Sequence, residues 1–470
     1  MSGQVIPLVV AALAVRVIYR NLQGESFGIF SIAISIHGLF SLLDLGLGRS
    51  TVRFLVKSRA HDDEVGATSV VVHSAMLLGA VSFLICGLMI GTAPLIASRW
   101  MQVSRDYRPI LTDCLYLLGC AVPFTGLMSV LRSVLEAHER FFEISLIQSL
   151  IGTLTYLLPM FISFYTTDVR WLVGGTVLCR ILNCGALAVA SAVVWTGKFA
   201  WRLVKLRPER EFRDFSSWLI ISNVVGVLIV YGDRALMTRM FSLAQIPFYN
   251  VPMEVISRLL ILVNATVTVL FPLLSRLAIQ KPGKNVTAPG FIAVFISTAF
   301  GPLLLILSIL ASSGLRVWLG DVFAMQSTGL VRFLLAGIAF QALNAFSMAS
   351  LNARGIAGRI ALMHLVEAPI YCAAIYFFGE RYGLLGVAAV WCVRPIAEYI
   401  LYTVMLIMSG SESAFEIDSR GMSLGFLNAI PLVLIAIGLP IPEVLIVYCV
   451  GVTLSCLWMR SKLRPVMAVG

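Results

Sequence analysis

The chain has 470 residues, of which 59% are hydrophobic and only 13% carry a charge at neutral pH. Soluble domains carry about 25% charged residues, so this composition excludes a soluble globular protein and indicates an all-α polytopic membrane protein. A formal net charge of +11 would suggest nucleic acid as the partner of a soluble chain, but basic cytoplasmic loops account for most of it here. We expect no nucleic-acid partner.

Apolar segments long enough to cross a bilayer recur along the whole chain. A spanning helix needs about 20 mostly apolar residues. By this measure we predict fourteen helices, near residues 4–22, 27–48, 66–92, 108–135, 143–166, 170–195, 216–240, 246–277, 289–314, 327–352, 358–378, 383–409, 424–438 and 442–459. The first has no basic residues before it and is predicted to span rather than to be cleaved. The last two are short, and a re-entrant hairpin is the alternative for them, so the total is 12–14 transmembrane helices.

A basic segment lies almost midway along this series and divides the first six spans from the next six. We predict an N-terminal lobe at 1–197, a basic cytoplasmic linker at 198–215, a C-terminal lobe at 216–410 and a C-terminal helix pair at 411–470. Paired halves with a site between them are a common plan of transporters. No loop exceeds roughly 20 residues, which excludes an attached soluble catalytic domain.

Lys and Arg in the loops predict the orientation. With the N-terminus in the cytoplasm, 21 of the 35 basic residues fall in inside segments and 8 in outside segments. Because basic residues concentrate in cytoplasmic loops, we expect both termini in the cytoplasm.

The other six basic residues are arginines inside the predicted spans. They are Arg16, Arg180, Arg234, Arg258, Arg332 and Arg394. A charge in hydrocarbon costs a few kcal/mol or more, so such residues line a cavity or pair with another group. Either the protein handles an anion at bilayer depth, or it needs internal ion pairs.

The segment 246–277 carries the clearest polar stripe. Steps of three and four residues align Asn250, Glu254, Ser257 and Asn264 on one helix face. Arg258 follows Glu254 by four residues, the favourable order for an ion pair. A helix–helix seam is one explanation of this face. We favour a cavity lining, because a single seam rarely needs a charged pair and two asparagines.

Two earlier spans also carry acids. Asn223 and Asp233 share a face of the seventh span, with Arg234 next to Asp233. Asp233 is a candidate either for a structural acceptor or for binding a coupling ion. Asp44, near the cytoplasmic end of the second span, is a candidate for ion coupling or for a solvated helix end.

Further ionisable residues occur in the eleventh and twelfth spans. His364 and Glu367 are three residues apart, and Arg394 and Glu398 are four apart. The second pair is as compatible with a structural role as with a functional one. Pro395 predicts a kink in the twelfth span.

Four arginines are the candidates for contact with an anionic substrate in a cationic cavity: Arg16, Arg234, Arg258 and Arg332. The planar arginine fork gives bidentate hydrogen bonds to phosphate, and its charge does not titrate. There is no P-loop, GxSxG or HExxH motif, the nine cysteines form no CxxC, and the five histidines are scattered. We therefore predict no catalytic residues, no cofactor and no metal site, and expect no ATP hydrolysis.

Two stretches, 22–54 and 223–277, resemble the polysaccharide transporter family of Wzx-type flippases. Its pattern has a G-x-x-x-F-G loop, a second span ending D-L-G-L-G-R, a D-R in the seventh span and L-F-P-x-L-S at the end of the eighth. The matching residues are Gly24, Phe27 and Gly28; Asp44 to Arg49; Asp233 and Arg234; and Leu270 to Ser275. Each motif alone is moderately specific, but their order and placement together are highly specific.

The resemblance implies the MATE/MOP superfamily fold: two six-helix lobes around a central cavity, plus two C-terminal helices. It implies that undecaprenyl-diphosphate-linked oligosaccharide crosses the bacterial cytoplasmic (inner) membrane by alternating access, for O-antigen, capsule or exopolysaccharide synthesis. The partners would be this lipid-linked substrate and membrane lipids. H+ or Na+, a polysaccharide polymerase and chain-length proteins are further candidate partners.

Two alternatives remain within this superfamily, a lipid II flippase and a MATE-type multidrug exporter. An exporter of cationic drugs should carry more acidic than basic residues in its cavity, whereas here the balance is basic. The alternative enzyme is a polysaccharide polymerase, which usually has a long external loop that this chain lacks.

Overall fold

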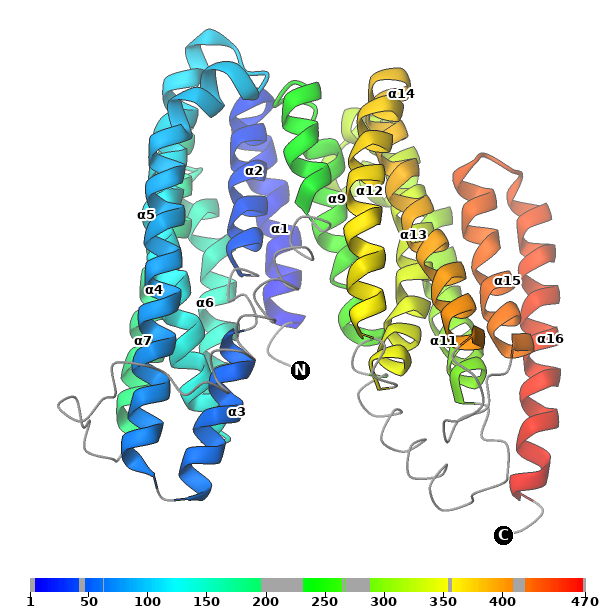
Figure 1. The fold of residues 1–470 in the computed structure, drawn as a ribbon. Coiled ribbons are helices and arrows are strands. Elements are labelled where there is room, and N and C mark those ends of the chain that lie inside the picture. Colours follow the sequence, from blue (N-terminus) through cyan, green and yellow to red (C-terminus); the bar gives the residue numbers. More distant parts are fainter. Residues whose placement is uncertain are drawn as a thin grey trace. The chain divides into compact units, whose positions relative to one another are not determined.

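The fold is seen in a computed structural model, drawn in Figure 1. The structure describes residues 5–41, 47–61, 63–195, 231–263, 266, 288–353, 357–408 and 419–467. Every regular element within these ranges is a helix; the β-bridge between Gln102 and Ser242 is isolated. The predicted all-α class is therefore confirmed.

The helices group into two compact units, Met1–Asn250 and Val251–Gly470. The packing boundary falls within helix α9 (Pro247–Ser257), so residues 231–250 pack with the N-terminal unit. The linker predicted at 198–215 lies outside the described residues, and the predicted domain limits stay predictions.

The N-terminal unit is built of helices. They are α1 (Val5–Leu22), α2 (Gly24–Ser41), α3 (Leu47–Ala60), α4 (Glu64–Leu95), α5 (Arg108–Ala137), α6 (Phe141–Ile162), α7 (Val169–Val194) and a helix at 231–240. Helix α5 packs against both α4 and α7, and α6 packs against α1 and α7. A core of Leu47, Leu55, Val71, Leu78 and Val134 joins α3, α4 and α5.

The motif around Gly24 has a structural explanation. Gly24 begins α2 with φ of +50°, a left-handed conformation that costs glycine little. Phe27 is buried and its ring lies edge-to-face on Tyr19, with centroids 5.0 Å apart. A Cβ on Gly28 would collide with the backbone carbonyl group of Leu243. The motif therefore fixes the start of α2 and its close contact with the 241–246 loop.

The C-terminal unit continues from α9. Its further helices are α11 (Ala288–Ile309), α12 (Ala311–Leu319), α13 (Asp321–Ala353), α14 (Ala357–Met408), α15 (Ser419–Ala436) and α16 (Ile441–Met467). Helix α14 reverses direction at Gly383, where φ is 64° and ψ is −152°, so it is a hairpin of two helical limbs. The limbs run from yellow to orange in Figure 1 and correspond to the spans predicted at 358–378 and 383–409.

Nine helices among the described residues are long and apolar enough to cross a membrane, and Gly24–Phe40 is a shorter apolar one. The α14 hairpin counts once in that number. Bulky apolar side chains such as Phe83, Val193 and Leu362 are more than half exposed, as expected for surfaces that face lipid. The protein is a multi-pass membrane protein. Both α15 and α16 are long enough to span, which favours two spans over a re-entrant hairpin.

The segment predicted as one helix at 246–277 differs in the structure. Helix α9 ends at Ser257, and a turn occupies 258–259 with i-to-i+3 hydrogen bonds such as Ile261 N–H to the Arg258 carbonyl oxygen. The chain is helical again at 260–263. Pro252 lacks a donor within α9, and the Ser257 hydroxyl donates to the Glu254 carbonyl oxygen. Both effects weaken the α-helical ladder, so the predicted helix is interrupted at 258–259; beyond 263 the predicted span lies outside the described residues, apart from Thr266.

Candidate functional site

Asp233 is completely buried on the 231–240 helix of the N-terminal unit. Its carboxylate accepts hydrogen bonds from the Tyr249 hydroxyl at 2.8 Å and from the Arg234 backbone N–H at 2.7 Å. The Arg234 guanidinium lies over the Tyr231 ring, 4.7 Å from its centroid, and Arg234 is only 9% exposed. These contacts favour a structural role for the Asp233 carboxylate and fix the position of the Arg234 guanidinium.

Asn250 lies one residue beyond Tyr249 and is 3% exposed. Within the described part of the chain, neither its amide nitrogen nor its carbonyl oxygen has a hydrogen-bond partner. Leaving a buried polar group unsatisfied costs about 1–3 kcal/mol, so the Asn250 amide is suited to meet a polar group other than those of the described residues. This agrees with its predicted place on a polar face.

Glu254 and Arg258 form the predicted ion pair, with 2.7 Å between Oε1 and Nη2. Both side chains are about one-third exposed, so the pair remains accessible. Ser257, on the same predicted face, points its hydroxyl at the Glu254 carbonyl oxygen, 3.1 Å away.

Arg332 and Arg16 are both half-buried. Arg332 on α13 makes one long contact, 3.5 Å from Nε to the Ser308 carbonyl oxygen. Arg16 on α1 takes part in no hydrogen bond or ion pair with another described residue. Neither arginine is neutralised by an acid in the described ranges, as expected for candidates that bind an external anion.

The structure gives Arg180 a role that the sequence did not. It is 4% exposed on α7, with Nη1 2.6 Å from the Thr125 hydroxyl oxygen and Nη2 2.9 Å from the His37 carbonyl oxygen. These contacts link α7, α5 and α2. Its partners lie far away in sequence, so no local spacing could have identified them.

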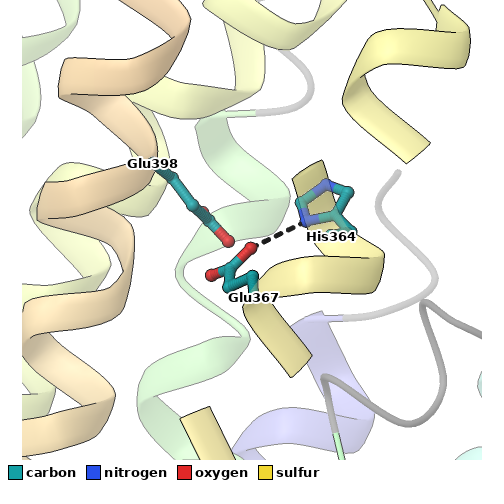
Figure 2. A group of neighbouring side chains, drawn as sticks. All are labelled: His364, Glu367 and Glu398. Atoms are coloured by element: carbon teal, nitrogen blue, oxygen red, sulfur yellow. Dashed lines mark hydrogen bonds and ion pairs between the residues drawn. The ribbon is translucent and has the colours of Figure 1, made fainter. Parts of the chain in front are cut away.

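In the C-terminal unit, three ionisable side chains meet between the limbs of the α14 hairpin (Figure 2). His364 and Glu367 come from the first limb and Glu398 from the second. Their candidate ligand atoms all lie within 4.8 Å of one another, and Nδ1 of His364 is 2.9 Å from a Glu367 carboxylate oxygen. We call these three residues the hairpin cluster. Sequence spacing predicted the pair on the first limb but not its meeting with Glu398.

Glu398 is the most connected member of the hairpin cluster. Arg394 pairs with it at 3.1 Å, and the Asn344 amide donates to it at 3.0 Å. Arg394 also reaches Gln341 at 3.4 Å and lies over the Tyr371 ring at 5.4 Å. The predicted Arg394–Glu398 pair is confirmed, with side chains only 10% and 4% exposed.

The remaining predicted site residues, Asp44, Asn223 and Asn264, lie outside the described residues. The described candidates divide between the two units. Arg16, Asp233, Arg234 and Asn250 belong to Met1–Asn250, whereas Glu254, Ser257, Arg258 and Arg332 belong to Val251–Gly470. A single cavity shared by all of them therefore stays a prediction. Chemically, the described side chains offer anion binding through accessible arginines and proton binding at buried acids and a histidine.

The fold is that of transporters of the MOP superfamily. An inward-facing multidrug resistance MATE transporter of that superfamily superposes with a TM-score of 0.71, over 86% of this chain and 98% of that one. The lipid II flippase MurJ, in an inward closed conformation, superposes with a TM-score of 0.69, over 99% of this chain and 98% of that one. Sequence identity is 14% in both cases, so these similarities define the fold alone.

The sequence places the chain more narrowly. Residues 17–327 match the family model described as polysaccharide biosynthesis protein, and the chain belongs to that family. A Shigella flexneri protein provisionally named an O-antigen transporter is 27% identical over 409 residues, which cover 85% of this chain and 94% of that protein. The Shigella protein is described as a transporter, and MurJ is described as a flippase.

Proposed function

We propose that the protein is a flippase that moves undecaprenyl-diphosphate-linked oligosaccharide units across the bacterial cytoplasmic membrane, for the synthesis of O-antigen, capsule or exopolysaccharide. The observation that carries this proposal is family membership together with similarity over nearly the full length of the Shigella O-antigen transporter. The multi-pass helical fold supports movement of a substrate within the membrane rather than chemistry upon it.

The substrate head group carries a diphosphate, and the proposed contacts are arginines. Arg258 is accessible beside Glu254, and Arg16 and Arg332 are half-buried without an acidic partner among the described residues. Arg234 is held over Tyr231, which orients its guanidinium. Guanidinium groups with fixed orientations bind phosphate well, because their parallel N–H groups match two phosphate oxygens.

Transport would proceed by alternating access, with the polar head group exposed first to the cytoplasm and then to the outer side while the polyprenyl tail stays in lipid. Asp44, Asp233 and Glu254 are the proposed sites for H+ or Na+, or for holding the arginines. Both termini would lie in the cytoplasm, and the polymerase and chain-length proteins would be functional partners. Asn250, Ser257, Asn223 and Asn264 would contact the sugars.

A lipid II flippase or a multidrug exporter is the alternative within the same fold. The intramembrane arginines favour an anionic substrate over a cationic drug. Lipid II and undecaprenyl-diphosphate-linked oligosaccharide both carry a diphosphate. The choice of the oligosaccharide as substrate rests on the family, whose description names polysaccharide biosynthesis.

The test is reconstitution of the purified protein in proteoliposomes that contain a fluorescent undecaprenyl-diphosphate oligosaccharide. We expect protein-dependent movement of the label between leaflets, measured by its protection from an external quencher. Parallel vesicles with lipid II and with a cationic dye identify the substrate class. Movement of lipid II or dye alone would reject the proposal, as would no movement of any substrate.

A further inference from the structure

The hairpin cluster lies inside the membrane-spanning part of the C-terminal unit. His364 and Glu367 are about two to three helical turns from the start of α14 at Ala357, and Glu398 is about three turns from its end at Met408. At 1.5 Å per residue, these groups stand about 10–15 Å inside the ends of the hairpin. Ionisable groups at such depth are costly and commonly functional.

The charges of this cluster do not balance within the protein. Glu367 and Glu398 contribute two negative charges when ionised, and Arg394 supplies one positive charge. Lys and other Arg side chains make no described ion pair with either carboxylate in these ranges. One negative charge therefore remains among side chains that are 4–20% exposed. A single bound positive charge would neutralise the group.

The Asn344 side chain on α13 connects that helix to the second limb of the hairpin. Asn344 donates through Nδ2 to the Glu398 carboxylate and to the Pro395 carbonyl oxygen. Its own carbonyl oxygen is buried and has no hydrogen-bond partner in the described part of the chain. Asn344 is 2% exposed, so bulk water does not satisfy that oxygen.

The imidazole of His364 is arranged to take a proton. Nδ1 faces the Glu367 carboxylate, which only accepts, so Nδ1 carries hydrogen. Nε2 faces the Tyr402 hydroxyl at 3.2 Å, a group that both donates and accepts. Both ring nitrogens are therefore engaged in hydrogen bonds. Tyr402 adapts to either protonation state by turning its hydroxyl hydrogen.

We propose that His364, Glu367 and Glu398 form a proton-binding site, with the exchanging proton on Nε2 of His364. In the neutral ring Tyr402 donates to Nε2; when a proton binds there, the new N–H donates to the Tyr402 oxygen. The charge of the site, including Arg394, then changes from −1 to zero. Tyr371, Gln341 and Asn344 are the other polar groups facing it, and Tyr399 is occupied by the Met422 carbonyl oxygen.

This site joins the two limbs of the hairpin, which gives proton binding a mechanical consequence. Protonated His364 offsets the repulsion between Glu367 and Glu398 and holds the limbs together, whereas loss of the proton leaves that repulsion uncompensated. Pro369 and Pro395 lie within the limbs near the site and each removes a backbone hydrogen-bond donor, which lowers the cost of bending there. If the protein is the proposed flippase, protonation of this site drives one step of transport.

The test is nuclear magnetic resonance of protein with 15N-labelled histidine in detergent. His364→Gln identifies the His364 signal, and we expect this signal to change reversibly when the ring gains and loses its proton. Glu367→Gln and Glu398→Gln should each change that titration, whereas replacing the exposed His61 with Gln should leave it unchanged. Glu367 is the more exposed acid, so Glu367→Gln keeps the test available if Glu398→Gln does not fold.

Two results would overturn the inference: a His364 signal that shows one protonation state at every pH at which the protein stays folded, or a signal that responds to Na+ instead of pH. In proteoliposomes, an imposed pH gradient should accelerate transport by wild type but not by His364→Gln. Titration without transport of any lipid-linked oligosaccharide would reject the flippase function and leave the proton site standing. Transport without titration would reject only the proton site.

Discussion

The hydroxyl of Tyr249 donates a hydrogen bond to the buried carboxylate of Asp233 across 2.8 Å. Asp233 is completely excluded from solvent, so this donor offsets part of the cost of burying an acid. The contact connects the D-R motif of the 231–240 helix to the start of α9. It gives the motif acid a structural partner that sequence spacing could not identify.

We therefore expect Tyr249→Phe to destabilise the protein by about 1–3 kcal/mol, because it removes a hydrogen bond to a buried charged group. Thermal unfolding in detergent measures the change. Tyr165→Phe is a matched control, since Tyr165 is 91% exposed and should have little effect. Equal midpoints for both variants would show that the Tyr249 contact contributes nothing.

Gly28→Ala tests the close contact between α2 and the 241–246 loop. A Cβ at this position meets the Leu243 backbone, which can move only by displacing the loop. Overpacking of this kind costs about 1–3 kcal/mol. Gly79→Ala on α4 is the control, because a Cβ there meets nothing within 4 Å. A lower unfolding temperature for Gly28→Ala alone is the expected result.

Arg394 and Glu398 offer a double-mutant cycle. Breaking a buried pair leaves an uncompensated charge, so Arg394→Met should cost about 3–5 kcal/mol. Adding Glu398→Gln to it should recover part of this loss, because the remaining charge is removed. The free energies of unfolding of the four proteins give the coupling. Additive losses would mean that the 3.1 Å contact carries no interaction energy.

The ion pairs show which side-chain contacts can be predicted from the sequence alone. Helix geometry fixes residues four apart on one face, and the pairs Glu254–Arg258 and Arg394–Glu398 were predicted correctly for that reason. The meeting of His364 with Glu398 depends on the reversal at Gly383, which brings together groups from two limbs. Periodicity within one helix carries no information on such contacts.

Helix positions followed from hydropathy, because burying unpaired backbone groups in lipid is so costly that apolar segments of this length must be helical. The end of α9 at Ser257 was not predicted. There the apolar pattern continues through 258–263, while Pro252 and a serine hydroxyl alter the backbone hydrogen bonds. A hydropathy profile contains no information on side chains that compete for backbone hydrogen bonds.

Asp168 gives a prediction of pH dependence outside the spans. Its hydrogen bond from the Arg170 side chain lowers the pKa of the carboxyl, which also caps the first turn of α7. A lowered folded-state pKa contributes stability above the unfolded value of about 3.9, and this contribution is lost as pH falls through the folded pKa. Asp168→Asn should therefore lower the unfolding temperature at neutral pH, with a smaller difference from wild type in acid. A difference independent of pH would contradict this.

Charge reversal tests the proposed anion contacts in cells. Arg258→Glu places a second acid beside Glu254, and Arg234→Glu places one near buried Asp233, so both should repel a diphosphate. We expect at least a tenfold loss of surface polysaccharide at equal membrane levels, corresponding to about 1.4 kcal/mol or more. Arg132→Glu is the control, since Arg132 is about half exposed and paired with Glu136. Unchanged polysaccharide with correctly inserted Arg258→Glu and Arg234→Glu would refute a role for these arginines in binding the substrate.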